Sequence, residues 1–206
     1  METTINSDQK PTGMTPDLLL HTCCGPCLEW PARQLINEGR HILVYFYNPN
    51  IQPAAENRRR LENMVQLAEK LGLPYVADQA CDPDVWQNWK DPSESRCHMC
   101  YRRRLLATAG LARREGIPAF STTLLVSPWQ DHQAILDIGR SIARSFNLDF
   151  IESYGQGQDF RDGYREGQRL AREDGLYRQK YCGCLPSLEQ SDFRDQIRLD
   201  LEALGD

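Results

Sequence analysis

Cysteine is the residue type whose number and spacing point most directly to chemistry in this sequence. The 206-residue chain contains eight cysteines, and seven of them lie in three tight clusters. The clusters have the patterns CCxxC, CxxC and CxC, formed by Cys23, Cys24 and Cys27, by Cys97 and Cys100, and by Cys182 and Cys184. Thiols grouped in this way are typical of metal or redox sites and are unusual for buried apolar side chains. The three clusters therefore predict a metal or redox centre.

The first cluster contains the tetrapeptide CGPC, which is typical of thioredoxin-like thiol oxidoreductases. Such an enzyme would use Cys24 and Cys27 at a helix N-terminus, where the helix dipole lowers a thiol pKa. That mechanism gives no role to Cys23 or to the other two clusters. Six or seven thiolates suit an iron–sulfur cluster with a metal ion beside it, and a zinc site in a non-catalytic binding module is the competing interpretation. On spacing, we favour iron–sulfur over structural zinc and both over thiol exchange.

Substrate-binding candidates stand in two loops near the clusters. Asn48 and Asn50 can hold a substrate, or they can shape the turn around Pro49. Tyr177 and Arg178 precede the CxC cluster and can grip a substrate, or they can pack within their own loop.

Proton-donor candidates lie in the segment after an apolar run that ends at residue 126. Asp131 and His132 can supply protons if the carboxyl pKa is raised or the imidazole is protonated. Gln130 is a further substrate-binding candidate. The alternative is that this segment forms a helix cap followed by exposed residues. Cys81 lies outside the clusters, and we expect it to be a buried structural thiol.

Short apolar runs alternate with amphipathic stretches and predict the elements that position these residues. Expected strands cover 17–22, 41–48, 73–77, 118–126 and 148–153. Expected helices cover 28–38, 53–71, 82–90, 97–115, 132–146, 160–174 and 187–204. This alternation predicts an α/β fold with a mostly parallel sheet and helices on both faces. The functional sites of such sheets lie at the carboxyl ends of the strands, where the cysteines of the first cluster stand.

The charge of the chain gives a mixed indication about partners. The net charge of −5 argues against a nucleic acid. However, 20 of the 24 basic residues are arginines, whose planar fork suits phosphate. They gather in the stretches 58–60, 102–114 and 161–178. Solvated helix faces paired with neighbouring acids are the simpler interpretation, and a polyanion-binding face stays open.

The remaining composition predicts one cytoplasmic domain with no membrane partner. No run approaches the roughly 18 apolar residues of a membrane span, and the polar start of the sequence shows no secretory signal. Eight cysteines in a reducing compartment also fit metal binding better than disulfides. We expect residues 1–16 to form a disordered lead-in and residues 17–206 to form a single α/β catalytic domain.

Six segments in order make a more specific pattern than any one of them. They are LLLHTCCGPC from Leu18, VYFYNPNIQPAAENRRR from Val44, CHMCYRRRLLATAGLA from Cys97, FSTTLLVSPWQDHQAI from Phe120, DFRDGYREG from Asp159 and LYRQKYCGCLPS from Leu176. Together they resemble the QueH family of epoxyqueuosine reductases, over about residues 18–187.

This resemblance implies an activity, a fold and partners. Enzymes of the family reduce the epoxide of epoxyqueuosine, at the tRNA wobble position, to queuosine, which is the last step of queuosine biosynthesis. The resemblance implies a 4Fe-4S cluster, a second metal ion (iron or zinc) close to it, and no cobalamin. The implied fold is Rossmann-like, of the HUP type. The implied partners are a tRNA with a GUN anticodon bearing epoxyqueuosine and an external electron donor.

The resemblance assigns the cysteines as ligands, and the implied reaction suggests roles for the other candidates named above. Six cysteines match the family motif and are the expected cofactor ligands: Cys23, Cys24, Cys97, Cys100, Cys182 and Cys184. Cys27 is added as a metal ligand, and the division of the seven between cluster and second ion stays open. Epoxide reduction needs two electrons and two protons, so Asp131 and His132 are the expected catalytic residues. Asn48, Asn50, Gln130, Tyr177 and Arg178 are the expected substrate-binding residues.

Overall fold

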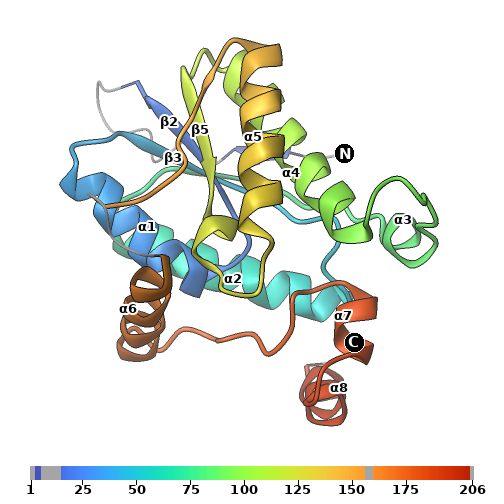
Figure 1. Cartoon of the computed structure of the whole chain (residues 1–206). Coiled ribbons are helices and arrows are strands. Elements are labelled where there is room, and N and C mark those ends of the chain that lie inside the picture. The colour runs from blue at the N-terminus through green and yellow to red at the C-terminus, as the bar shows by residue number, and fades with distance from the viewer. Residues whose placement is uncertain (1–2, 6–14, 156–159, 205–206) are drawn as a thin grey trace.

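A computed structural model, shown in Figure 1, describes residues 3–5, 15–155 and 160–204. Within these residues a six-stranded sheet has the order β1-β4-β3-β2-β5-β6. Its strands are β1 (Thr3–Ile5), β2 (Leu18–Thr22), β3 (Ile42–Tyr47), β4 (Tyr75–Asp78), β5 (Ala119–Thr122) and β6 (Asp149–Phe150). All neighbouring pairs are parallel except β1 with β4. The expected mostly parallel α/β sheet is confirmed.

The strand order is that of a doubly wound sheet. From the central strand β2 the chain moves outward through β3 to β4, and it then returns to the other side of β2 as β5 and β6. With right-handed crossovers, this reversal places the helices on opposite faces. Accordingly, α1 (Gly25–Asn37) packs against α2 (Ala54–Lys70), and α4 (Arg96–Arg114) packs against α5 (His132–Phe146), as Figure 1 shows.

β2 lies at the centre of the core because strands flank it on both sides and helices cover both faces. All five residues of LLLHT are buried. The polar His21 is neutral and structural, since its Nδ1 accepts from the Thr122 hydroxyl at 2.8 Å and its Nε2 donates to Tyr47 O at 3.1 Å. Burial and the nearby charge of Arg104 lower the pKa of His21 to about 3. The buried and hydrogen-bonded strand therefore fixes the position of Cys23 and Cys24, which follow it.

The fourth parallel strand ends earlier than the expected 118–126. Thr122 Oγ1 accepts a hydrogen bond from Leu124 N at 3.2 Å and caps the short 3₁₀ helix η2 (Thr123–Val126). Such side-chain bonds to the backbone compete with strand pairing. The apolar segment after Thr122 therefore stays buried but turns across the end of the sheet and contacts α1.

The last expected helix, 187–204, is split in two. The C-terminal part forms α7 (Leu185–Glu189) and α8 (Arg194–Glu202). Between them the Ser191 hydroxyl accepts from Phe193 N at 3.2 Å, which interrupts the helical hydrogen bonding. The remaining helices are α3 (Pro83–Gln87), shorter than the expected 82–90, and α6 (Phe160–Glu173), which packs on α1.

The crevice between the connections that leave β2 and β5 is where doubly wound sheets bind ligands. The first connection leads to α1, and the second leads through η2 to α5, on the other face. Cys23 N donates to Thr123 Oγ1 at 3.4 Å and so joins the two sides of the crevice. The first cysteine cluster therefore lies at the reversal point of the sheet.

The expected lead-in over residues 1–16 falls only partly within the described residues. Thr3–Ile5 form β1, and residues 1–2 and 6–14 lie outside the described part. A single catalytic domain over 17–206 stays a prediction. Among the helices that the structure describes, none is long and apolar enough to cross a membrane.

Candidate metal centre

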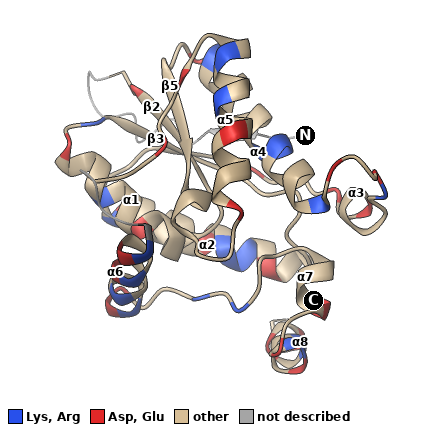
Figure 2. Ribbon diagram, in the orientation of Figure 1, with Lys and Arg blue, Asp and Glu red and all other residues tan. Residues whose placement is uncertain are grey.

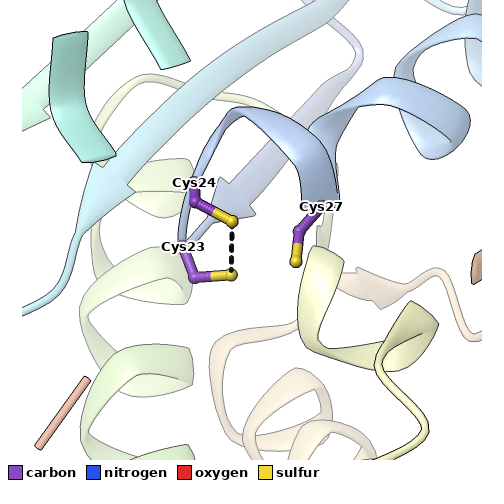
Figure 3. Close-up of side chains that lie close together, drawn as sticks. All are labelled: Cys23, Cys24 and Cys27. Atoms are coloured by element: carbon purple, nitrogen blue, oxygen red, sulfur yellow. Dashed lines mark hydrogen bonds between the residues drawn. The ribbon is translucent and has the colours of Figure 1, made fainter. Parts of the chain in front are cut away.

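Cys23, Cys24 and Cys27 converge at the junction between β2 and α1. Cys24 is the N-cap of α1, and Pro26 stands in the first turn, where its missing N–H is not needed. The three sulfurs lie within 4.8 Å of one another, and the Cys23 and Cys24 Sγ atoms are 3.7 Å apart (Figure 3). All three residues are buried. Sulfurs at these separations can bind one metal ion together.

The glycine of CGPC is explained by helix packing. Gly25 lies so close to α2 that an added Cβ would be 2.7 Å from Asn63 O. Any side chain here would push α1 away from α2 and would displace the cysteines on either side. The tetrapeptide therefore serves the close approach of two helices, whether or not thiol exchange takes place.

Of the three thiols, Cys23 is the one whose surroundings favour the thiolate. Hydrogen bonds from Cys24 and Cys27 lower the pKa of Cys23 well below its usual range, and the charges of Arg104 and Arg60 lower it further. Burial and the hydrogen bond to Cys23 raise the pKa of Cys24. Hydrogen bonds to Cys23 and Cys24 raise the pKa of Cys27. A bound cation would allow all three to ionise, because metal ligands are deprotonated.

The thioredoxin-like alternative fits this arrangement poorly. Its nucleophile must be accessible and must have a low pKa. Cys24 is only 1% exposed, and its pKa is raised. The donor set fits a metal centre better, because three soft thiol ligands are buried together beside compensating arginines.

Arg104 lies within reach of all three cysteine clusters. This buried guanidinium donates from Nη2 to Cys100 Sγ at 3.1 Å and from Nη1 to Asn48 Oδ1 at 3.5 Å. Burial opposes its charge, but electrostatic interactions with Cys100, Cys182 and Cys23 raise the pKa of Arg104 above its usual value. One cation thus favours the ionised form of cysteines that are far apart in sequence.

The second and third clusters meet around a small apolar core. Cys100 and Cys184 pack with Trp86 and Met99 in one buried group, whereas Cys97 and Cys182 are exposed. Trp86, at 2% exposure, is the least exposed member of this group.

Arg60 holds the CxC segment against α2. Its Nη1 donates to Cys182 O and its Nη2 to Tyr181 O, each at 3.0 Å. Its Nε donates to the buried Glu56 carboxylate at 2.6 Å. Because the guanidinium and carboxylate are both buried and hydrogen-bonded, this contact positions the third cluster firmly.

The turn between Cys182 and Cys184 requires glycine. Gly183 has φ +127°, and an added Cβ would lie 2.9 Å from Ile51 Cγ1 and 3.2 Å from Arg60 Nη1. Gly183 O also accepts from Gln52 N at 2.8 Å. The loop after β3 and the CxC turn are therefore packed directly on each other.

A cavity of about 440 Å³ opens beside the cysteines. Cys23, Cys27 and Cys182 line it together with Arg60 and Arg104. Amides and aromatic rings contribute much of the remaining wall, among them Gln130, Gln179, Trp129, Tyr164, Tyr181 and Phe193. Its volume is in the range of small-molecule sites.

Two glutamines connect the cavity wall to sulfur. Gln179 Nε2 lies 3.7 Å from Cys27 Sγ, and Gln130 Nε2 lies 3.8 Å from Cys182 Sγ. Tyr101 donates from its hydroxyl to Gln130 Oε1 at 2.9 Å and so orients that amide. Gln130 is placed as a substrate-binding residue would be, and that role stays a prediction.

Asn48 and Asn50, expected to bind substrate, are instead packed inside the protein. Asn48 donates to Thr22 O at 2.9 Å and accepts from Arg104, which ties the end of β2 to that arginine. Asn50 is 1% exposed. Neither is among the residues that line the cavity.

Asp131 and His132 lie near the cavity but not in its described wall. Asp131 is exposed and caps α5, since its Oδ1 accepts from Ala134 N at 3.0 Å. This bond and a contact with His98 lower the pKa of Asp131, so it is ionised at neutral pH and poorly suited to donate a proton. His132 Nε2 lies 2.8 Å from the carbonyl oxygen of Ser127, which lines the cavity.

Tyr177 and Arg178 also lie away from the described cavity wall. The Tyr177 hydroxyl donates to Glu56 at 3.0 Å, and Arg59 stacks on its ring with 3.5 Å between guanidinium carbon and ring centroid. This tyrosine therefore fastens the loop to α2. Arg178 is exposed, with no hydrogen bond or ion pair to the described residues.

The arginine-rich stretches divide into paired and inward-facing residues. On α6, Arg165 and Arg169 pair with acids of the same helix, and Figure 2 shows both signs of charge along it. The simpler interpretation, a solvated helix face, is confirmed there. Arg60 and Arg104 differ, because each points into the cysteine site. The sequence does not distinguish them from their neighbours, since each is one of three consecutive arginines.

Cys81, which we expected to be buried, is exposed. It follows β4 in a surface loop, where Gln52 Nε2 donates to its sulfur at 2.6 Å. The expectation was wrong because cysteine is usually buried, whereas this loop leaves the core at Asp78.

Comparison with known proteins gives one consistent family. The family model described as epoxyqueuosine reductase QueH matches residues 18–190. A protein of that name from Thermotoga maritima is 36% identical over 181 residues, covering 83% of this chain and 90% of its own. Another from Dehalococcoides mccartyi is 33% identical over 175 residues, covering 84% and 93%.

Solved structures resemble the chain only loosely. A deacetylase–teicoplanin complex aligns with a TM-score of 0.44 at 12% identity, covering 76% of this chain and 86% of its own. That likeness supports no functional conclusion. The family model, the relatives and the site geometry agree, and the chain belongs to the epoxyqueuosine reductase QueH family.

Proposed function

We propose that this protein reduces the epoxide of epoxyqueuosine, at the wobble position of a tRNA with a GUN anticodon, to give queuosine. The observation that carries the proposal is that, in a QueH-family chain, Cys23 and Cys27 of the first cluster and Cys182 of the third line one cavity. Arg104, which also lines it, donates to Cys100 of the second cluster. The tRNA substrate and the compartment are proposed together, since free thiols and tRNA both fit the reducing cytoplasm.

The proposed cofactors are a 4Fe-4S cluster and a second ion, iron or zinc, without cobalamin. The proposed ligands are the seven clustered cysteines, with Cys27 as a candidate for the second ion. When bound, the cluster supplies electrons one at a time and the ion supplies a Lewis acid. Arg60 and Arg104 would offset the negative charge of the thiolates, which is otherwise costly in a buried site.

The cavity is the proposed place for the modified base. Recognition of one base in an RNA loop favours a base turned out of the stack and held by hydrogen bonds. The amides of Gln130 and Gln179 lie next to Cys182 and Cys27, so they can hold the base beside the cofactor. Arg178, exposed and unpaired within the described residues, is a candidate for phosphate.

Of the two expected proton donors, Asp131 and His132, we propose His132 for this role. Its ring lies at hydrogen-bond distance from Ser127, at the edge of the cavity. Asp131 is poorly suited to donate a proton, because capping of α5 keeps its carboxyl ionised. An external electron donor is required, since the reaction consumes two electrons.

Anaerobic turnover of epoxyqueuosine-containing tRNA tests the proposal. The protein is purified anaerobically, its iron and sulfide are measured, and it is incubated with that tRNA and a chemical reductant. Nucleoside mass analysis should show the loss of one oxygen from the modified base. A protein that contains iron and sulfide but leaves the epoxide intact would contradict the proposed reaction, and a protein with zinc alone would contradict the proposed cofactor.

A further inference from the structure

Exposed aromatic surface is concentrated at the cavity that contains the cysteines. Trp129 is 83% exposed and Phe193 is 57% exposed, and both line this cavity. The other large apolar side chains exposed among the described residues are aliphatic and do not line it; they are Ile36, Leu106, Leu199 and Leu204. Single exposed apolar residues need no explanation, but two aromatic rings beside one functional cavity suggest a ligand surface.

The backbone that presents Trp129 is fixed relative to the cysteines. Trp129 N donates to Ser127 Oγ at 3.4 Å, within the turn between η2 and α5. The next residue, Gln130, is held by Tyr101 and reaches Cys182 Sγ. The indole therefore projects to solvent from a turn whose neighbouring side chain reaches a proposed cofactor ligand.

Phe193 has positive charge beside it. The Lys180 ammonium lies 5.9 Å from the centroid of its ring and pairs with Asp200 at 3.6 Å. Arg178 is exposed two residues earlier, with no ion pair to the described residues. Aromatic rings with nearby cations match an unpaired nucleic acid strand, whose bases stack while its phosphates meet lysine or arginine.

We propose that Trp129 and Phe193, the aromatic rim, stack on the unpaired loop nucleotides that flank the reacting nucleoside. This rests on the proposed function, because it takes an RNA loop as the ligand. The cavity would hold the turned-out base, and the rim would hold its neighbours. The rim would then act before chemistry, by binding and positioning, and would not touch the epoxide.

Binding of an anticodon stem–loop RNA tests the rim. Trp129→Ala and Phe193→Ala should each raise the dissociation constant for the RNA about tenfold at fixed salt. This loss of affinity is within the range for the loss of one base stack. Trp129→Phe should restore most of the affinity. Leu199→Ala is the matched control, because Leu199 is 61% exposed but lies outside the cavity wall. In turnover, the alanine variants should raise KM and keep kcat, with unchanged iron content.

The outcomes separate the rim from the proposed reaction. If the wild type reduces epoxyqueuosine but Trp129→Ala and Phe193→Ala bind and turn over normally, the rim proposal is wrong and the reaction stands. If the alanine variants lose RNA affinity while the wild type cannot reduce the epoxide, the rim stands and the reaction is wrong. If the wild type does not bind the RNA, the rim proposal is wrong too.

A second, independent observation concerns Asn50. Both polar atoms of this buried side chain lack a hydrogen-bond partner among the described residues. Its Nδ2 lies 3.4 Å from the position that a Cβ on Gly183 would take, in the turn between Cys182 and Cys184. Native proteins rarely bury an amide with neither group paired, so a missing partner at this turn is indicated.

We infer that Asn50 donates a hydrogen bond to sulfur of the metal–thiolate group held by the CxC segment. This rests on the proposed cofactor and makes Asn50 a positioning residue for the cofactor, not for the substrate. A donor to sulfur favours the more reduced, more negative state of an iron–sulfur centre. Its removal should therefore lower the reduction potential.

An anaerobic redox titration, followed by electron paramagnetic resonance, tests Asn50. Asn50→Ala and Asn50→Leu should both keep iron and sulfide but lower the midpoint potential. The leucine variant matches the volume and removes the unpaired groups, so it should stay folded. Asn88→Ala, at an exposed asparagine, is the control. An unchanged potential in a fully loaded variant would overturn the inference, whereas a wild type without a reducible centre would overturn the proposed cofactor too.

Discussion

The cysteine clusters reach the site in two different ways. Cys23, Cys24 and Cys27 are placed by adjoining regular elements, since they follow the buried strand β2 and begin α1. Cys182 and Cys184 lie in a loop, and side chains from distant parts of the chain hold that loop in place. The first arrangement depends on local sequence, whereas the second depends on a few long-range contacts. Substitutions should therefore affect the two regions differently.

The largest expected effect is on metal binding at the first cluster. Loss of a residue that only supports a metal ligand typically costs about 10–100-fold in metal affinity. Cys24→Ser removes a proposed ligand itself and should therefore cost more than that. Its fold should persist, because β2 and α1 do not depend on the thiol. Iron and sulfide content with circular dichroism would measure both. Cys81→Ser is the control. A similar loss of metal from this variant would contradict the assignment of the clustered cysteines as the metal ligands.

Breaking the tether of the third cluster should affect stability as well as metal binding. Arg60→Met leaves the buried Glu56 carboxylate unpaired, which should cost about 3–5 kcal/mol of unfolding free energy. Arg102→Met removes an exposed pair with Glu94 and should cost about 0–1 kcal/mol. Urea unfolding of the two variants gives the comparison. Equal losses would show that Arg60 does not carry the tether.

The CxC turn should tolerate a side chain less well than an ordinary helix end. Gly72 has φ +66° with open space around it, so Gly72→Ala should cost about 1–2 kcal/mol. Gly183→Ala adds close contacts with Ile51 and Arg60 to the backbone strain and should cost more. It should also lower metal content, which Gly72→Ala should leave unchanged. Equal urea midpoints for the two variants would contradict the packed turn.

The smallest expected effect is at Asp131. Asn also caps helices, so Asp131→Asn should keep both the fold and turnover, whereas loss of a true general acid costs about 10²–10⁴-fold. The folded-state pKa of Asp131 is lowered, so its stabilising charge is present above the usual value of 3.8 and is lost as the pH falls through the lower, folded value. A 100-fold loss of kcat in Asp131→Asn at neutral pH would contradict this prediction and would support Asp131 as the proton donor.

Elements with a clear period or cap could be predicted from the sequence. β2 with its LLLHT run and α1 after Gly25-Pro26 lie where the pattern places them. Thr122 could not be foreseen as the end of β5, because the apolar run continues through Val126 and only the threonine cap turns it into η2. Asp131 was ambiguous for a related reason, since carboxylates that cap helices and carboxylates that donate protons are the same residue type.

The cysteine clusters, the parallel sheet and the family follow from the sequence alone, because they depend on local spacing and on the order of motifs. Only the tertiary structure decided which side chains face the cysteines. Arg60 and Arg104 each stand in a run of three arginines, and helix packing selects the one that turns inward. The same holds for Asn50 and Trp129, one buried and one exposed, because burial depends on contacts between segments far apart in the chain.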